Sequence, residues 1–182
     1  CGQEHISALT TVSRFSLPHA RAIIDTYVEA GLETISLRPI SPFGFAVKSA
    51  SKLGYSTTEF MKFYREAIAY LIELNLQGVR LEETYASLLL TRILTPFPTS
   101  YVDLQSPAAA GRNVLVYNYD GGVYVSDEAR MLAEMGDDRF RMGDVNQELA
   151  RLQKSPAMQI INNHGVAEEL SGCCDCAFVP YL

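Results

Sequence analysis

The sequence lacks a basic region, and this absence limits the partners that the protein can have. Its 15 Lys and Arg residues are outnumbered by 21 Asp and Glu residues, which gives a formal net charge of -6. A protein that binds nucleic acid normally gathers Lys and Arg residues to neutralise phosphates, and no such cluster occurs along this chain. We therefore expect no nucleic-acid partner.

Long apolar runs are also missing. The two longest apolar stretches, residues 67–76 and 86–94, both contain charged residues and are shorter than the ~20 residues that a membrane-spanning helix needs. The first residues do not show the basic, apolar and small-residue order of a secretory signal peptide. We expect a cytoplasmic protein without a membrane partner.

Motifs that define an enzyme class are scarce. The sequence contains no glycine-rich phosphate loop, no zincin helix and no nucleophile elbow, and its three histidines, His5, His19 and His164, lack metal-ligand spacing to one another. The catalytic residues therefore stay unknown at this level. The chain does have 48% hydrophobic residues over 182 positions, which is enough for one or two packed regions.

The first half alternates strand and helix patterns, which predicts an α/β fold. Residues 6–12 and 34–38 are rich in β-branched side chains and predict strands, while Ser16 and Pro18 suit the start of a helix that runs between them to about Ala30. A strand, a helix and a strand joined by short turns are typical of a βαβ unit with parallel strands.

Two further helices follow in the first half. Ser56 and Glu59 form a capping box for a long helix, and the next helix covers about residues 83–94. Pro96 and Pro98 then mark the best internal boundary, because proline ends helices.

The second half begins with a predicted hairpin. Residues 114–117 and 123–125 flank the sequence Asn-Tyr-Asp-Gly-Gly, whose residues tolerate turn conformations. Asp127 and Glu128 follow and open a short helix. Their carboxylates could serve as a general acid or base, but acidic residues in a first helical turn are also favoured by the helix dipole alone.

Three of the four cysteines lie close together near the end of the sequence, at Cys173, Cys174 and Cys176. The two-residue gap between Cys173 and Cys176 allows both thiolates to point at one metal ion from a tight turn. A complete metal or cluster site needs about four protein ligands, so this is half a site. The alternatives are three ordinary thiols in a loop and a small zinc-stapled protein.

Five segments in this order resemble the C-terminal part of radical S-adenosylmethionine (SAM) enzymes that mature peptides and proteins. These segments are SLRPISPFGFA, SPAAAG, VLVYNYDGGVYVSDEARML, FRMGDV and CCDCAFVPYL. Within that family the chain most resembles the His-Xaa-Ser system radical SAM maturases. The resemblance implies that residues 1–98 are the C-terminal βα units of a partial (β/α)6 barrel. Residues 99–182 would then be a truncated SPASM-like extension that binds an auxiliary cluster or the substrate.

The resemblance also implies a function. The full-length enzyme would use S-adenosylmethionine to generate a 5′-deoxyadenosyl radical and would modify a peptide or protein substrate. The family's CxxxCxxC loop, which holds the catalytic iron–sulfur cluster, is absent from this sequence, so we do not expect the chain to be active alone. Ser13, Arg14 and Arg38, at the ends of predicted strands, are the candidates for contacts with the cofactor.

The extension of this family usually binds auxiliary 4Fe-4S clusters, and the match here is partial. Cys173 and Cys176 fit the family pattern, with Cys174 as an alternative metal ligand. Ser106 and Ser126 lie about where many relatives have cysteines, and Leu182 stands where a further tail cysteine would fall. The alternative function is therefore a non-catalytic peptide-binding module that has kept the fold of the extension and lost its clusters.

Overall fold

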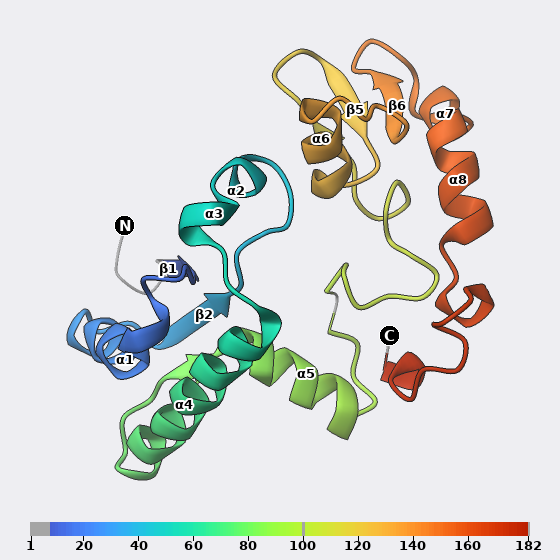
Figure 1. Cartoon of the computed structure of the whole chain (residues 1–182). Helices are drawn as coiled ribbons and strands as arrows, with labels where there is room; N and C mark the ends of the chain where they lie inside the picture. Colours follow the sequence, from blue (N-terminus) through green and yellow to red (C-terminus); the bar gives the residue numbers. More distant parts are fainter. Residues whose placement is uncertain (1–7, 100, 182) are drawn as a thin grey trace. The chain divides into compact units, whose positions relative to one another are not determined.

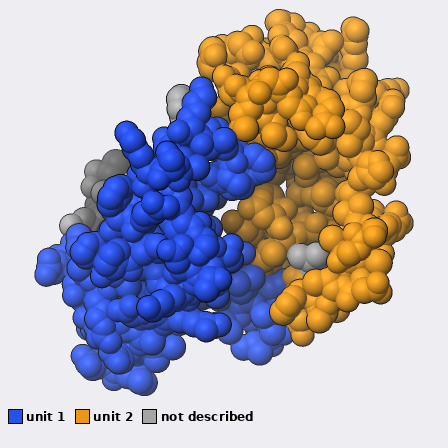
Figure 2. All heavy atoms as spheres, in the orientation of Figure 1, with its two compact units in different colours: residues 1–97 blue, residues 98–182 orange. Residues whose placement is uncertain are grey.

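The computed structural model of the protein describes residues 8–99 and 101–181 (Figure 1). The chain forms two compact units, Cys1–Phe97 and Pro98–Leu182, which Figure 2 distinguishes by colour. Each unit has a hydrophobic core of its own. No helix among the described residues has the length and apolar character needed to cross a membrane.

The first unit contains a parallel sheet in the order β1-β2-β3. Its strands are β1 (Ala8–Thr11), β2 (Thr34–Arg38) and β3 (Glu82–Glu83). A short 3-10 helix, η2 (Leu17–His19), and helix α1 (Ala20–Glu29) connect β1 to β2, so the predicted βαβ unit is confirmed. Ile6 and Ser7, which belong to the predicted first strand, lie outside the described residues.

A longer connection leads from β2 to β3 and contains α2 (Phe45–Lys48), α3 (Ala50–Leu53) and α4 (Thr57–Leu76). The predicted capping box begins α4, because Ser56 Oγ accepts a hydrogen bond from Glu59 N and the Glu59 carboxylate accepts one from Ser56 N. Helix α5 (Thr84–Leu94) follows β3 directly.

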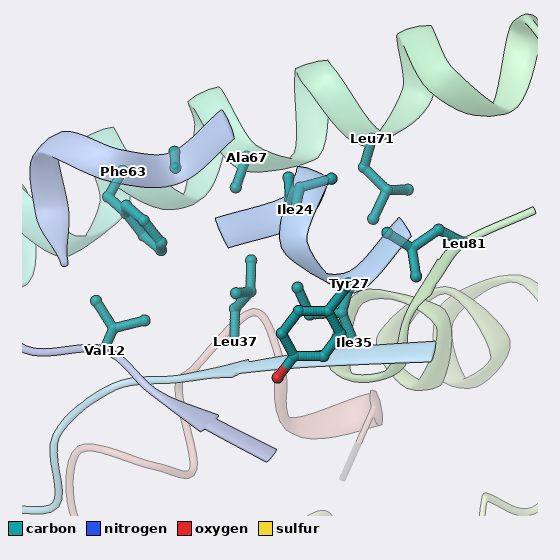
Figure 3. Packing of buried hydrophobic residues seen from close by; sticks show 10 residues of the cluster. Val12, Ile24, Tyr27, Ile35, Leu37, Phe63, Ala67, Leu71 and Leu81 are labelled. Carbon is teal, nitrogen blue, oxygen red and sulfur yellow. The ribbon is translucent and has the colours of Figure 1, made fainter. Parts of the chain in front are cut away.

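The core of the first unit lies between the sheet and two helices. Figure 3 shows Ile35 and Leu37 of β2 facing Ile24 and Tyr27 of α1, and the side of α4 that carries Phe63, Ala67 and Leu71 packs above them. Those three α4 residues are spaced four apart, so they lie on one helical face. This apolar face therefore holds α4 over the sheet.

The opposite face of this sheet is open at its first two strands. Strand register pairs Leu9 with Ser36 and Thr11 with Arg38, and successive strand residues point to opposite faces. These residues therefore face away from Ile35 and Leu37, and Leu9, Thr11 and Arg38 are exposed. Parallel sheets are normally covered on both faces, so the exposure of these residues is unusual for a parallel sheet.

The second unit contains an antiparallel sheet in the order β4-β5-β6. Its strands are β4 (Val116–Tyr117), β5 (Gly122–Tyr124) and β6 (Arg141–Asp144). Strands β4 and β5 form the predicted hairpin, with Val116 paired to Tyr124. The helices are α6 (Asp127–Glu134), α7 (Leu149–Leu152) and α8 (Pro156–His164), and two 3-10 helices, η3 (Ala167–Glu169) and η4 (Val179–Tyr181), complete the unit.

Candidate functional site

The strand ends of the first unit bring the three predicted cofactor-binding residues to one edge. Ser13 and Arg14 follow β1, and Arg38 is the last residue of β2. The strands run in parallel, and the Val12 N–H donates to the Arg38 carbonyl over 2.8 Å. This edge is the place where open parallel sheets bind ligands.

Tyr55 ties the two strand ends together. Its hydroxyl accepts a hydrogen bond from the Ile40 N–H over 2.8 Å and donates one to the Val12 carbonyl over 2.9 Å. Burial raises the pKa of the Tyr55 hydroxyl above its ordinary value, which keeps the hydroxyl protonated and able to donate. The edge is therefore preorganised by a residue from the long connection.

Arg14 is engaged with the chain's own backbone. Its Nε donates to the Gly54 carbonyl over 2.8 Å, and its main-chain N–H donates to the Leu53 carbonyl over 2.9 Å. A further guanidinium contact reaches the Ser51 carbonyl at 3.5 Å. Arg14 therefore holds the end of α3 against the β1 end, which is a positioning role.

Ser13 is also occupied locally. Its N–H donates to Ser16 Oγ over 3.2 Å, and the two hydroxyl oxygens lie 3.3 Å apart. The prediction that the Ser16 side chain caps the following helix is wrong, since it makes no cap hydrogen bond there. The Ser16 hydroxyl is held by the preceding turn instead.

Arg38 is the candidate whose charge remains available. Its side chain is exposed on the open face of the sheet, beside Thr11 in register. Within residues 8–99 and 101–181, no side-chain hydrogen bond or ion pair occupies its guanidinium. A free guanidinium can take a carboxylate or phosphate in a two-pronged contact, so Arg38 can bind an anionic ligand at this edge.

Glu83 is a buried carboxylate that the sequence analysis did not identify. Its side chain is 3% exposed and accepts hydrogen bonds from the Leu37 N–H over 3.1 Å, the Tyr64 hydroxyl over 2.6 Å and the Ala86 N–H over 2.6 Å. Leu81 is also buried and Glu82 is exposed. The sequence signal that could have identified Glu83 is the strand alternation over residues 81–83. In a strand, every second side chain points to the same face, which places Glu83 on the buried face with Leu81.

The three tail cysteines do not form a metal centre within the described residues. Cys173 is half-buried, and Cys174 and Cys176 are exposed, all as free thiols. In the part of the chain that the structure describes, no three His, Cys, Asp or Glu side chains are placed to hold a metal ion. Three thiols suit iron chemically, but this arrangement does not fit a complete cluster site. Metal ligation by the tail stays a prediction.

The two serines at expected cysteine positions have structural partners. Ser106 donates to the Glu168 carboxylate and accepts from the Ala167 N–H over 3.1 Å. The hydrogen bond from the Ser106 hydroxyl lowers the pKa of the Glu168 carboxyl. Ser126 caps α6 by accepting from the Ala129 N–H over 3.2 Å. Both hydroxyls thus stabilise the second unit.

The acidic pair after the hairpin has a structural explanation too. Asp127 forms an ion pair with Arg130, with 2.9 Å between Asp127 Oδ1 and Arg130 Nη2. Both Asp127 and Glu128 lie in the first turn of α6, where the helix dipole favours negative charge.

Leu182, which stands where a further tail cysteine is expected, lies outside the described residues.

The mixed α/β fold with two small sheets is similar to part of the fold of a radical SAM enzyme. Solved structures with this likeness include those of anSMEcpe, an anaerobic sulfatase-maturating radical SAM enzyme. The structure of native anSMEcpe with bound AdoMet and the Kp18Cys peptide matches with a TM-score of 0.66 and 17% sequence identity. Native anSMEcpe with bound AdoMet matches with a TM-score of 0.62 and 18% identity.

Each of these two matches covers 95% of this chain and 45% of the anSMEcpe chain. The chain therefore spans less than half the length of these solved structures. No family model matches the sequence, and no curated protein matches it. At this level of identity the comparisons establish the fold, and the closer resemblance to the His-Xaa-Ser system maturases stays a prediction.

Proposed function

We propose that the chain is the C-terminal part of a radical SAM enzyme that modifies a peptide or protein. The observation that supports this most is the match of 95% of the chain, through both units, to part of an enzyme solved with AdoMet and a peptide. The domain assignments, a partial barrel over residues 1–98 and a SPASM-like extension over residues 99–182, belong to the same proposal.

The proposed task of the first unit is ligand binding at the strand ends. In radical SAM enzymes, S-adenosylmethionine is the source of the 5′-deoxyadenosyl radical that abstracts hydrogen from the substrate. Arg38, exposed beside Thr11, fits the carboxylate of such a ligand. Arg14 and Tyr55 hold the edge in place through the backbone contacts described above. Ser13 lies at the same edge and supplies a half-buried hydroxyl.

Ligand binding tests this proposal directly. We expect the full chain to bind S-adenosylmethionine in equilibrium dialysis, and Arg38→Ala to weaken that binding about tenfold, which corresponds to ~1.4 kcal/mol. Arg80→Ala removes an exposed arginine that precedes β3, so it serves as the matched control. Equal binding by both variants, or no binding by the parent chain, would contradict the assignment of Arg38.

Iron binding by Cys173, Cys176 and the alternative ligand Cys174 is a separate part of the proposal. Because the described residues do not complete such a site, it requires at least one further ligand. The test is anaerobic addition of ferrous iron and sulfide, followed by iron analysis and visible absorption. Iron that is retained by the parent chain and lost in Cys173→Ser supports ligation, and equal iron in both contradicts it.

A non-catalytic peptide-binding module is the second candidate function. Ser106 and Ser126 favour it, because both hydroxyls are used in hydrogen bonds that a cluster ligand could not make at the same time. A chain that retains peptides from an array but does not bind S-adenosylmethionine would support the module. Binding of S-adenosylmethionine that depends on Arg38 would support the enzyme.

A further inference from the structure

The cysteine tail is folded into consecutive hydrogen-bonded turns. The Cys173 and Cys174 N–H groups both donate to the Leu170 carbonyl, over 3.0 and 2.9 Å. Gly172 has a φ of +84°, which a glycine adopts without strain. The Cys176 N–H then donates to the Cys173 carbonyl over 2.8 Å. This last bond closes a four-residue turn with a cysteine at each end.

This turn places the Cα atoms of Cys173 and Cys176 within the range that a disulfide can join. The ends of a β-turn have Cα atoms closer than ~7 Å, and disulfides join residues whose Cα atoms are ~4.4–6.8 Å apart. Cys173 and Cys174 are neighbours, with Cα atoms only ~3.8 Å apart, which is below the disulfide range. The backbone therefore favours a bond between Cys173 and Cys176 over one between adjacent cysteines.

The thiols are also available for reaction. Cys176 is exposed and Cys173 is half-buried. In the described part of the chain, neither belongs to a group of side chains that could hold a metal ion. Of these two thiols, Cys176 is therefore the one that an incoming reagent reaches more easily. Cys173, at the other end of the turn, is then the resolving thiol.

We propose that Cys173 and Cys176 form a redox-active dithiol that exchanges with small disulfides such as glutathione disulfide. The Cys176 thiolate attacks one sulfur of the small disulfide, which forms a mixed disulfide and releases one small thiolate. The Cys173 thiolate attacks Cys176 Sγ in that mixed disulfide, which forms the internal bond and releases the second small thiolate. The two released thiolates take up the two protons lost by the protein, and the small disulfide is the two-electron oxidant.

This activity goes beyond the proposed function, since it requires neither S-adenosylmethionine nor iron. It does have a consequence for that function. Only thiolates bind iron, so the oxidised turn cannot supply Cys173 and Cys176 as ligands. Reduction of this pair would therefore precede any iron binding by the tail.

The test uses the full chain carrying Cys1→Ser, so that three of the four cysteines remain. The protein is equilibrated without metal in mixtures of reduced and oxidised glutathione, alkylated and analysed by tandem mass spectrometry. We expect the three alkylatable thiols to fall to one, with the remaining alkyl group on Cys174. Adding Cys174→Ser should leave the oxidation midpoint unchanged, since Cys174 takes no part.

Cys173→Ser and Cys176→Ser separate the pair from ordinary thiols. Each should stop at a mixed disulfide with glutathione and form no internal bond, while its amide spectrum matches that of the parent. An internal bond to Cys174, or glutathione adducts on all three cysteines of the parent without an internal bond, would overturn the proposal. This experiment contains no iron and no S-adenosylmethionine. Its result therefore neither supports nor contradicts the proposed function, which is tested separately.

Discussion

At the scale of single residues, Glu83 organises the junction between β3 and α5. Its carboxylate accepts hydrogen bonds from β2, α4 and the first turn of α5, through Leu37, Tyr64 and Ala86. A buried carboxylate is stable only when its oxygens are hydrogen-bonded. The Glu83 carboxylate therefore serves as the hydrogen-bond acceptor for three donors that water would otherwise have to satisfy.

Removing this carboxylate should be costly. We expect Glu83→Ala to lower the free energy of unfolding of the first unit by about 3 kcal/mol, because each buried donor left without an acceptor costs ~1–3 kcal/mol. Glu82→Ala is the matched control, since Glu82 is the exposed neighbour on the same strand, and its effect should stay within ~0.5 kcal/mol. Urea unfolding measures both. Similar losses for the two variants would contradict the role of Glu83.

Tyr64 makes the same junction sensitive to alkaline pH. Burial, followed by the hydrogen bond to Glu83, raises the pKa of the Tyr64 hydroxyl above its ordinary value of 10.0. A raised pKa means that the neutral hydroxyl stabilises the fold fully below pH 10.0, and that this stability is lost as pH rises above the pKa of the unfolded chain.

Tyr64→Phe tests this pH dependence. The variant should lose about 2 kcal/mol at neutral pH, because one hydrogen bond to a carboxylate is removed. Its stability should then fall less steeply than that of the parent above pH 10.0. Tyr119→Phe, at a hydroxyl on a 90% exposed residue, controls for the substitution itself at neutral pH. An unchanged alkaline slope in Tyr64→Phe would refute the argument.

At the scale of elements, Gly111 sets how closely its loop approaches α8. Its φ is +67°, and a Cβ atom at this position would overlap the Met158 sulfur. Its N–H donates to the Val125 carbonyl over 2.8 Å, which fixes the loop beside the end of β5. The positive φ therefore favours glycine here, and a Cβ atom would also require the Met158 side chain to move.

A comparison of two glycines separates these two causes. Gly136 also has a positive φ, +95°, but a Cβ atom there would meet nothing within 4 Å. We expect Gly136→Ala to cost ~1–2 kcal/mol from the left-handed backbone alone. Gly111→Ala should cost a further ~1–3 kcal/mol from overpacking against Met158. Thermal unfolding measures the stability of both variants. Equal losses of stability would show that the Met158 side chain moves aside without cost.

Elements with strong local signals were predictable from the sequence, and elements made by tertiary pairing were not. The capping box at Ser56 located the start of α4, and the turn sequence before Gly122 located the β4–β5 hairpin. Strand β3 has only two residues, so the alternation over residues 81–83 is too short to outweigh the helix pattern that follows it, and the prediction began a helix at Glu83 instead. Strand β6 contains Gly143, which is unfavourable in strands, and it exists because it pairs with β5.

The candidate site likewise has features that the sequence could predict and features that depend on tertiary contacts. Strand prediction was sufficient to bring Ser13, Arg14 and Arg38 to one edge, because parallel strands end together. The sequence could not show that Arg14 is held by Gly54, forty positions away, since that contact depends on how the long connection folds. As a result, the three candidates were equal at the level of the sequence, whereas the contacts distinguish Arg38 from the other two.

At the scale of the whole molecule, the chain contains two hydrophobic cores with no residue in common. Ile24 belongs to the first core and is fully buried, and Leu152 belongs to the second and is 3% exposed. A compact unit with its own core can unfold by itself. The proposed ligand-binding edge and the cysteine turn thus belong to units that have separate sources of stability.

Core substitutions test that separation. We expect Ile24→Ala to destabilise the first unit by ~2–5 kcal/mol and Leu152→Ala to destabilise the second unit by a similar amount, because each creates a cavity. Native-state hydrogen exchange reports each unit separately, through the amides of α4 and of β5. Ile24→Ala should speed exchange in α4 and leave β5 unchanged, and Leu152→Ala should do the reverse. If either variant accelerated both sets of amides equally, the two units would unfold together, and the Cys173–Cys176 turn would respond to changes at the proposed ligand-binding edge.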